Sequence, residues 1–210
     1  MEPTLTRCPA AEGTALANLG TEVELDGELM ARTAAGDRRA FSSLVDRHKD
    51  ALVTYLTRLC ANRQRAEDLA QDSFIRLFQA AGSYRDRGSF RGYLYRIGTN
   101  LLRSEQRREQ RWRFLEPALR PMLRLAAEDR TTEPQRKVFA DEAQQQVAGA
   151  LAELPIEYRA PLVLFEIEGW SYQRIAEALD CREGTIKSRI HRGRQRLRRS
   201  LEGYFKGETS

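Results

Sequence analysis

Apolar side chains recur about every three to four positions along most of the chain, which is the spacing of one face of an α-helix. The pattern begins near Glu28, continues to about Arg111, and resumes from about Lys137 to Leu201. Alternating runs of β-branched residues bounded by turns, which would indicate strands, do not occur in the sequence. The sequence therefore predicts an all-α protein.

Breaks in this pattern divide the chain into two small helical domains. The expected units are a flexible N-terminal tail (1–25), a first helical domain (26–111), a flexible linker (112–137), a second helical domain (138–202) and a flexible C-terminal tail (203–210). The linker contains Pro117, Pro121 and Pro134, and proline disfavours a helix interior. We therefore expect the last helix of the first domain to end near Arg111.

The first domain begins with an amphipathic helix in "AFSSLVDRHKDALVTYLTRLC" (40–60). Its predicted core stripe contains Phe41, Leu44, Val45, Leu52, Leu56 and Leu59. His48 falls on the same stripe, and no motif that would supply a metal or catalytic partner accompanies it. We interpret His48 as a core or half-buried histidine.

The next helix, "AEDLAQDSFIRLFQAAG" (66–82), has two distinct faces. The predicted core stripe is Ala66, Ala70, Phe74, Leu77, Phe78 and Ala81, and a second, acidic stripe holds Asp68, Gln71, Asp72 and Ile75. A paired-carboxylate catalyst is disfavoured, because no basic partner, glycine-rich loop or metal spacing lies nearby. The stripe fits either an ordinary solvated face or a docking surface for a basic protein.

A basic stripe follows on the helix "FRGYLYRIGTNLLRSEQRREQR" (90–111), which Ser89 is placed to cap. The predicted core positions are Phe90, Tyr93, Leu94, Ile97 and Leu101, and beside them lie Arg96, Asn100, Arg103 and Arg107. The preceding loop, "GSYRDRGSF", adds Tyr84, Arg85 and Arg87. Amides and guanidinium groups read base edges, aromatic rings stack on unpaired bases, and positive charge binds phosphates, so this surface resembles one that binds nucleic acid.

The second domain contains a helix-turn-helix pattern. Gly169 is expected to end one helix, and Ser171 to cap the next, whose apolar face carries Ile175, Ala176 and Leu179. After the short break "DCREG", a longer helix carries an apolar back of Ile186, Ile190, Leu197 and Leu201, with Gly193 on the same stripe for close helix packing. In such a unit the second helix enters the major groove of DNA.

The front of that second helix lies in "GTIKSRIHRGRQRLRR" (184–199), which has no acidic residue. Lys187, Ser188, His191 and Arg192 lie within its early turns, where side chains reach base edges. Later positions point several ways and suit phosphates: Arg194, Arg196, Arg198 and Arg199. The alternative is a solvated basic helix end that the helix dipole favours.

Composition narrows these interpretations only slightly. The 210 residues carry a formal net charge of +5, which permits an anionic partner but does not choose between nucleic acid and a membrane surface. No stretch is apolar for long enough to span a bilayer, and the N-terminus lacks a secretory signal pattern, so no membrane insertion is expected. Cys8, Cys60 and Cys181 are widely spaced and lack metal-site spacing, which is typical of free thiols in the reducing cytoplasm.

Three segments together resemble bacterial RNA polymerase sigma factors of the extracytoplasmic-function (ECF) group: "AEDLAQDSFIRLF", "SFRGYLYRIGTN" and "LPIEYRAPLVLFEIEGWSYQRIAEALDCREGTIKSRIHRGRQRLRRSL". The resemblance covers about 28–111 and 138–202. It implies that the first domain is sigma domain 2, which binds the clamp helices of core RNA polymerase and reads and opens the −10 promoter element. The second domain would be sigma domain 4, which binds the β-flap and reads the −35 element.

The resemblance also implies a role for each exposed face. Polymerase binding falls on Asp68, Gln71, Asp72 and Ile75; −10 DNA binding on Tyr84, Arg85, Arg87, Arg96, Asn100 and Arg103; and −35 DNA binding on Lys187, Ser188, His191, Arg192 and Arg196. Trp170 stands where the family commonly has leucine. An anti-sigma partner is common in the family, although nothing in the sequence identifies one.

Two other functions fit the sequence less well. A helix-turn-helix regulator that acts without being a polymerase subunit would explain 138–202 but would leave both stripes of the first domain without a role. A nuclease would need clustered metal-binding carboxylates or a nucleophile with a base, and the acids of 67–72 do not provide that set. We therefore expect a non-enzymatic promoter-specificity subunit with no cofactor and no metal.

Overall fold

A computed structural model of the protein describes residues 26–85, 89–123 and 142–205. Helices account for most of these residues, and no strand occurs among them, which confirms the prediction of an all-α fold. The remaining residues include most of the expected linker, the whole N-terminal tail and most of the C-terminal tail, so these assignments lie largely outside the described part of the chain.

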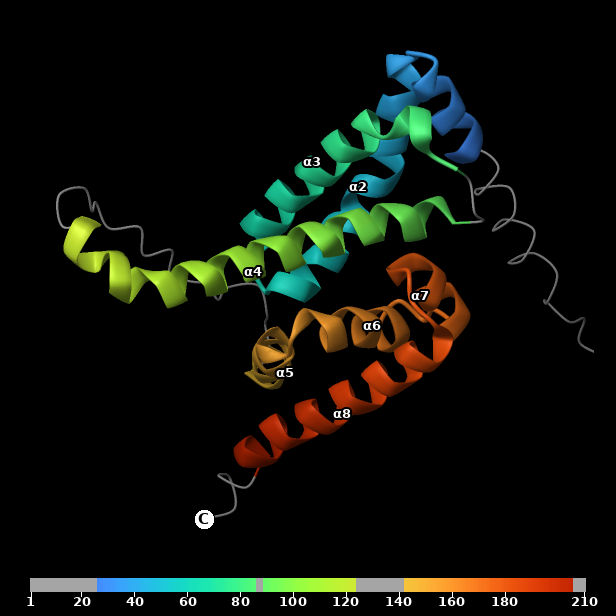
Figure 1. Ribbon diagram of the computed structural model, residues 1–210. Helices are drawn as coiled ribbons and strands as arrows, with labels where there is room; N and C mark the ends of the chain where they lie inside the picture. The colour runs from blue at the N-terminus through green and yellow to red at the C-terminus, as the bar shows by residue number, and fades with distance from the viewer. Residues whose placement is uncertain (1–25, 86–88, 124–141, 206–210) are drawn as a thin grey trace, which may run out of the picture.

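The helices form two bundles (Figure 1). The N-terminal bundle consists of a helix over 26–34, α2 (Arg38–Cys60), α3 (Arg63–Gln79), the short 3₁₀ helix η1 (Ala81–Ser83) and α4 (Phe90–Leu123). The C-terminal bundle consists of α5 (Glu142–Glu153), α6 (Ile156–Glu166), α7 (Tyr172–Leu179) and α8 (Glu183–Phe205). α4 crosses the middle of the molecule between α2 and α3 on one side and the C-terminal bundle on the other.

Side-chain caps fix where several helices begin. The hydroxyl of Ser89 accepts a hydrogen bond from the Gly92 amide at 3.0 Å, and that of Ser171 accepts one from the Arg174 amide at 3.2 Å. Both caps were predicted, because serine satisfies an amide that the first helical turn leaves unpaired. Gly169 has the expected left-handed conformation, with φ of +67°.

Tyrosine and leucine side chains fill the core of the N-terminal bundle. Leu52, Leu56 and Leu59 of α2 are fully buried, as predicted. Beside them the rings of Tyr55 and Tyr95 stack with centroids 4.3 Å apart. His48 is also buried, and its Nε2 lies 2.9 Å from a carboxylate oxygen of Asp26, which confirms its interpretation as a core histidine.

Some predicted core positions were wrong. On α3, Phe78 is 45% exposed while Leu69 is buried. On α4, Tyr93 and Ile97 are partly buried and pack against the core as predicted, but the fully buried Tyr95 was not among the predicted positions. Both helices pack against more than one neighbour, so the buried surface of each is broader than the single stripe that periodicity defines, which explains why Leu69 and Tyr95 were not predicted.

The predicted helix ends near Arg111 and Leu201 were also too early. α4 continues to Leu123, past Pro117 and Pro121, and α8 continues to Phe205. A proline inside a helix removes one hydrogen bond and bends the axis, but it does not always end the helix. The far part of α4 projects beyond the other described helices (Figure 1).

The C-terminal bundle contains the predicted helix-turn-helix, formed by α7 and α8. Ile175, Ile186 and Ile190 are fully buried in it. A Cβ placed on Gly193 would lie 3.4 Å from the carbonyl oxygen of Tyr158, so α8 crosses α6 closely at this glycine, as expected. The turn between α7 and α8 includes Asp180 in the left-handed conformation.

A buried arginine ties this bundle to the other one. Arg159 of α6 is 3% exposed, and its guanidinium donates hydrogen bonds to the carbonyl oxygens of Leu154 and Ala152 near the end of α5 and of Leu59 near the end of α2. Burial lowers the pKa of Arg159 to about 10. Backbone carbonyls at helix ends lack helical partners, so this one side chain satisfies such groups in both bundles.

The core of the N-terminal bundle yields a stability prediction. Leu56→Ala should lower the free energy of unfolding by about 2–5 kcal/mol, because it leaves a cavity in a fully packed site. Tyr55→Phe should lower it by only about 0.5–1.5 kcal/mol, since the Thr99 hydroxyl that loses the tyrosine still donates to the Tyr95 carbonyl. Urea unfolding followed by circular dichroism measures both values, and equal losses would contradict the packing described here.

Candidate protein and nucleic-acid interfaces

The acidic stripe of α3 lies on the outside of the N-terminal bundle. Asp68, Gln71 and Asp72 are exposed, and Ile75 is 54% exposed, so the four residues share one solvent-facing surface. Phe78 extends this surface, and its ring packs edge-on against Phe41 at 4.9 Å. Neither aspartate forms an ion pair with another described residue. The result is an acidic surface with an apolar end, which is suited to a partner that is basic and partly apolar.

The basic stripe of α4 is present as predicted, but its side chains differ in their surroundings. The Arg96 guanidinium lies 5.1 Å from the centre of the Tyr93 ring, in a cation–π contact. Asn100 is exposed, and its side-chain oxygen accepts a hydrogen bond from Arg103 at 3.0 Å. Burial lowers the pKa of Arg103, and the nearby charges of Arg189 and Arg107 lower it further.

The loop before α4 borders this stripe. The Tyr84 ring contacts the Tyr93 ring edge-on at 5.1 Å and is partly buried, while Arg85 is exposed. Arg87, also predicted to bind DNA, lies outside the described residues. The loop and the stripe thus place aromatic, amide and guanidinium groups at one end of the bundle, as the sequence predicted.

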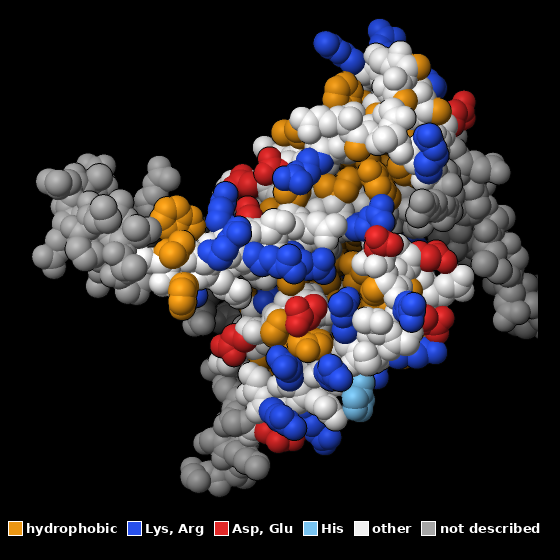
Figure 2. Space-filling model, viewed as in Figure 1, with side chains coloured by type: hydrophobic (Ala, Val, Ile, Leu, Met, Phe, Trp, Pro, Cys, Tyr) orange, Lys and Arg blue, Asp and Glu red, His pale blue; other side chains and the backbone are white. Residues whose placement is uncertain are grey.

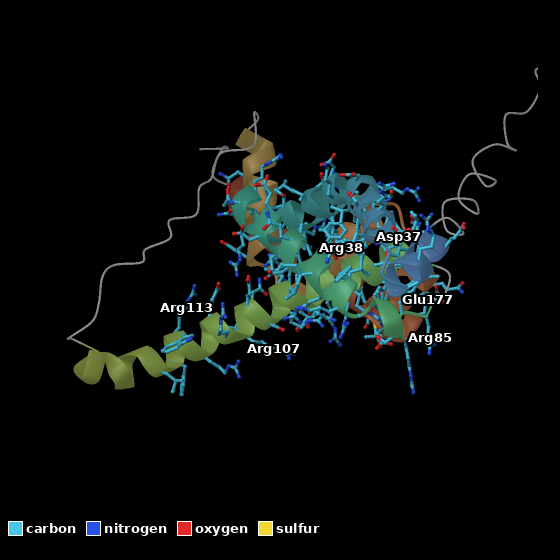
Figure 3. The ribbon with its side chains drawn as sticks, turned by 90° about the horizontal axis from the view of Figure 1, so that it is seen from above. Asp37, Arg38, Arg85, Arg107, Arg113 and Glu177 are labelled. Atoms are coloured by element: carbon cyan, nitrogen blue, oxygen red, sulfur yellow. The ribbon has the colours of Figure 1, made fainter. Side chains whose placement is uncertain are left out.

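A cleft of about 860 Å³ separates this loop from the helix-turn-helix. Its N-terminal wall includes Arg85 and Arg96, and its other wall includes Glu177, Asp180 and Glu183. Figure 3 shows Arg85 and Glu177 at the same end of α4, whereas Arg107 and Arg113 lie along its projecting part. The basic groups of the N-terminal bundle therefore face a wall that is mainly acidic but also contains Arg182.

The predicted reading face of α8 is exposed. Lys187, Ser188, His191 and Arg192 all lie at the surface, and Figure 2 shows basic side chains gathered over α8 as well as along α4. Lys187 lies 2.7 Å from Glu183, and this hydrogen bond raises the pKa of the lysine. Arg192 forms no ion pair with another described residue, so its guanidinium is available to a ligand.

Two later arginines of α8 instead contact α6. The Arg196 guanidinium lies 4.6 Å from the centre of the Tyr158 ring, and Arg194 pairs with Glu166 at 2.5 Å. Both arginines remain exposed, so these contacts fix their direction without removing them from solvent. Packing on α6 therefore orients two of the arginines that the sequence predicts to contact DNA.

The contacts between the bundles were missed by sequence reasoning. Glu168 pairs with Arg58 of α2 at 2.5 Å and with Arg91 of α4 at 2.9 Å. Trp170 is 3% exposed and stacks on Tyr95 with ring centroids 5.4 Å apart. The one available signal was the unusual tryptophan at 170, and it does not identify the partner.

The described residues offer little for metal or thiol chemistry. No group of histidine, cysteine and acidic side chains within them could hold a metal ion. Burial raises the pKa of the Cys60 thiol and of the Cys181 thiol, which disfavours the reactive thiolate. None of the described helices is both long enough and apolar enough to cross a membrane.

Comparisons with known proteins match both bundles. Residues 44–113 match the family model for sigma-70 region 2, and residues 144–197 match that for sigma-70 region 4. The chain is 41% identical over 168 residues to the ECF RNA polymerase sigma factor SigE of Mycolicibacterium smegmatis, a match that covers 79% of the chain and 64% of that protein. It is 33% identical over 170 residues to the ECF RNA polymerase sigma factor SigW of Bacillus subtilis, covering 79% of the chain and 91% of that protein.

A solved structure shares the arrangement of helices. It is that of the sigma factor RpoE in complex with the anti-sigma factor NepR from Bartonella quintana. The TM-score is 0.56 at 25% sequence identity, and the match covers 77% of this chain and 96% of the other.

Proposed function

The chain belongs to the ECF RNA polymerase sigma factors, and from this premise we propose how its surfaces divide the work of promoter recognition. Domain 2 (26–111) docks on core polymerase and reads and opens the −10 element. Domain 4 (138–202) binds the β-flap and reads the −35 element, and residues 112–137 link the two. The observation that supports this proposal is that one chain has an acidic face and two separate basic faces, all outside its cores.

The acidic stripe of α3 is the proposed contact with the clamp helices. Asp68 and Asp72 supply charge and Ile75 supplies an apolar contact, and all three are exposed. An unpaired acidic face gains most from a basic partner, because opposite charges steer and align the two surfaces. A helix-turn-helix regulator that does not join the polymerase would have no use for this face.

The basic stripe of α4 and its loop are the proposed −10 site. Tyr84, Arg85, Arg87, Arg96, Asn100 and Arg103 make up this site. Asn100 offers an amide to a base edge, while Arg96 and Arg103 offer charge to the strand. Opening of the duplex needs such a surface, since unpaired bases must find new partners once they leave the stack.

The exposed face of α8 is the proposed −35 site. Lys187, Ser188, His191 and Arg192 read base edges from the early turns, and Arg196 supports binding from a later turn. The contacts of Arg194 and Arg196 with α6 direct both side chains along the surface, where phosphates of the DNA backbone would lie. This division assigns specificity to one end of the helix and charge to the other.

The remaining assignments follow from this role. The protein acts as a polymerase subunit and not as an enzyme, and it works in the cytoplasm, where bacterial polymerase and chromosome are located. The related RpoE structure contains the anti-sigma factor NepR. A comparable protein that masks domains 2 and 4 is the proposed regulator of this chain. Co-purification with core polymerase tests the proposal, because the polymerase-independent regulator does not require it.

The docking surface yields the first functional prediction. Asp68→Arg with Asp72→Arg should abolish binding to core polymerase while the helical content stays unchanged, since both residues are exposed and would then repel a basic surface. The matched control is Asp46→Arg with Asp50→Arg, which makes the same charge change on exposed positions of α2. Titration of labelled protein with core polymerase measures both. Equal affinity of the two variants would refute the assignment.

The proposed −10 site yields the second functional prediction. Asn100→Ala should weaken promoter opening by the holoenzyme and leave duplex binding at the −35 element nearly unchanged. Loss of one amide contact to a base reduces discrimination by about 1–3 kcal/mol. Permanganate reactivity of unpaired thymines reports the opening, and Gln146→Ala, which removes an exposed amide from α5, serves as the control. Bubble reactivity equal to that of the wild type would disprove the role of Asn100.

The proposed −35 site on α8 yields the third functional prediction. Arg192→Ala should weaken binding to the cognate −35 duplex by about 1–3 kcal/mol and relax preference at one or two base pairs. Arg199→Ala should weaken binding to cognate and scrambled duplexes by similar factors. It should also reduce the slope of log K against log salt concentration by about one, because a phosphate contact releases counterions but reads no bases. Binding of each variant to both duplexes, measured over a range of salt concentrations, distinguishes the base-reading role from the phosphate-binding role. The reverse pattern would mean that the helix docks in the opposite direction.

A further inference from the structure

The recognition helix α8 begins with an acidic residue. It starts at Glu183, one position before the segment 184–199, which has no acidic residue. In its first turn the amides of Thr185 and Ile186 donate to the carbonyl oxygen of Arg182. The helix dipole favours an acid at this end. The same end of a recognition helix meets the base edges, so Glu183 lies beside the residues of the proposed −35 site.

Glu183 forms a close pair with Lys187, one helical turn later. A carboxylate oxygen of the glutamate lies 2.7 Å from the lysine ammonium group, and the two side chains are 47% and 57% exposed, respectively. Glu183 also lines the cleft between the bundles, but nearly half of its side chain stays open to solvent. The pair therefore places a hydrogen-bond acceptor and a donor side by side at the surface of α8.

Two stacked aromatic rings hold the lysine from another side. The Lys187 ammonium group lies 5.4 Å from the centre of the Tyr172 ring, and that ring stacks on the Phe165 ring with centroids 4.6 Å apart. Both rings pack against the core, so their positions are fixed. A lysine is otherwise a flexible point charge. Here the carboxylate and the ring orient it before DNA binds.

The absence of net charge on the pair limits what it can bind. A lone lysine is attracted to any phosphate, and a phosphate contact carries no sequence information. Beside Glu183 the lysine loses much of this attraction, because phosphate oxygens repel the carboxylate. A ligand that binds both members must offer acceptors to the lysine and a donor to the glutamate.

A G·C base pair offers this combination in the major groove. Guanine presents the acceptors O6 and N7, which suit lysine, and cytosine presents the N4 amino donor, which suits glutamate. Lys187 and Arg192 can only donate hydrogen bonds, and the Ser188 hydroxyl can donate or accept. An ionised carboxylate only accepts, so Glu183 adds to the reading face a group that requires a donor on the DNA.

We propose that Glu183 is a further base-reading residue of the −35 site and that, together with Lys187, it selects a G·C base pair. Lys187 donates to the guanine, and Glu183 accepts from the cytosine amino group. Tyr172 is a positioning residue, because it acts through the lysine. The inference rests on the proposed function for the location of the −35 site. It deepens that function by naming the base pair and an acidic residue that reads it.

Loss of the carboxylate tests the assignment in the reconstituted holoenzyme. The template is a promoter that the wild-type holoenzyme transcribes, with every base pair of its −35 element varied, and transcript sequencing gives the preference at each position. Glu183→Ala should reduce the preference for G·C at one position by about tenfold and leave the other positions unchanged. Glu177→Ala is the matched control, because it removes an exposed acid from the preceding helix α7.

Binding to DNA that lacks the element provides a second measurement. Free full-length Glu183→Ala should bind a scrambled duplex several-fold more tightly than the wild type, because Lys187 is then available to a phosphate. The slope of log K against log salt concentration should steepen by about one. Glu177→Ala leaves Lys187 paired with Glu183, so the slope should stay that of the wild type.

Two changes at Tyr172 test its positioning role. Tyr172→Phe keeps the ring beside Lys187 and should keep the preference for G·C. Tyr172→Leu removes the ring and should weaken that preference by several-fold at the same position as Glu183→Ala. A purely structural role would instead lower transcription from all variants of the element by similar factors.

The outcomes separate this inference from the proposed function. An unchanged preference at every position in Glu183→Ala would overturn the inference, as would a loss at an A·T position or an equal loss in Glu177→Ala. In each of these cases the wild-type holoenzyme still initiates at the promoter. A wild-type chain that gives core polymerase no promoter-specific transcription would overturn the proposed function itself.

Discussion

The packing of the two bundles on each other depends on one carboxylate held between two arginines of the other domain. Glu168 lies two residues after the end of α6, and its partners Arg58 and Arg91 come from α2 and α4. A carboxylate that is removed from water needs charged partners, so this site helps to hold the two bundles together. The stacking of Trp170 on Tyr95 then fills the space beside it with apolar contact.

As a result, α4 has different surroundings on three of its sides. Its core side packs on α2 and α3, another side carries Arg96 and Asn100, and a third contacts the helix-turn-helix through Gly92. A helix that meets neighbours on several sides cannot be described by a single apolar stripe. Contact with the helix-turn-helix and the proposed reading of DNA thus fall on the same helix.

Much of the fold and of the candidate site could be predicted from the sequence, and the failures have a physical pattern. Periodicity predicted helices and the exposure of Asp68, Asn100 and Arg192, because a side chain off the apolar stripe must face solvent or a partner. Periodicity did not predict that Tyr95 is buried, because a single apolar stripe describes packing against only one neighbour. It could not find the pair of Arg58 and Glu168, whose members lie 110 residues apart and carry no local signal.

The distance between the domains, free and bound to core polymerase, tests the central claim most directly. Spin labels on the exposed positions Ser42 and Ser200 report it by double electron–electron resonance. The account predicts one narrow distribution of distances in the free chain and a clearly different distance after addition of stoichiometric core polymerase. A distance that stays the same in the complex, or a free chain that is already extended, would contradict it.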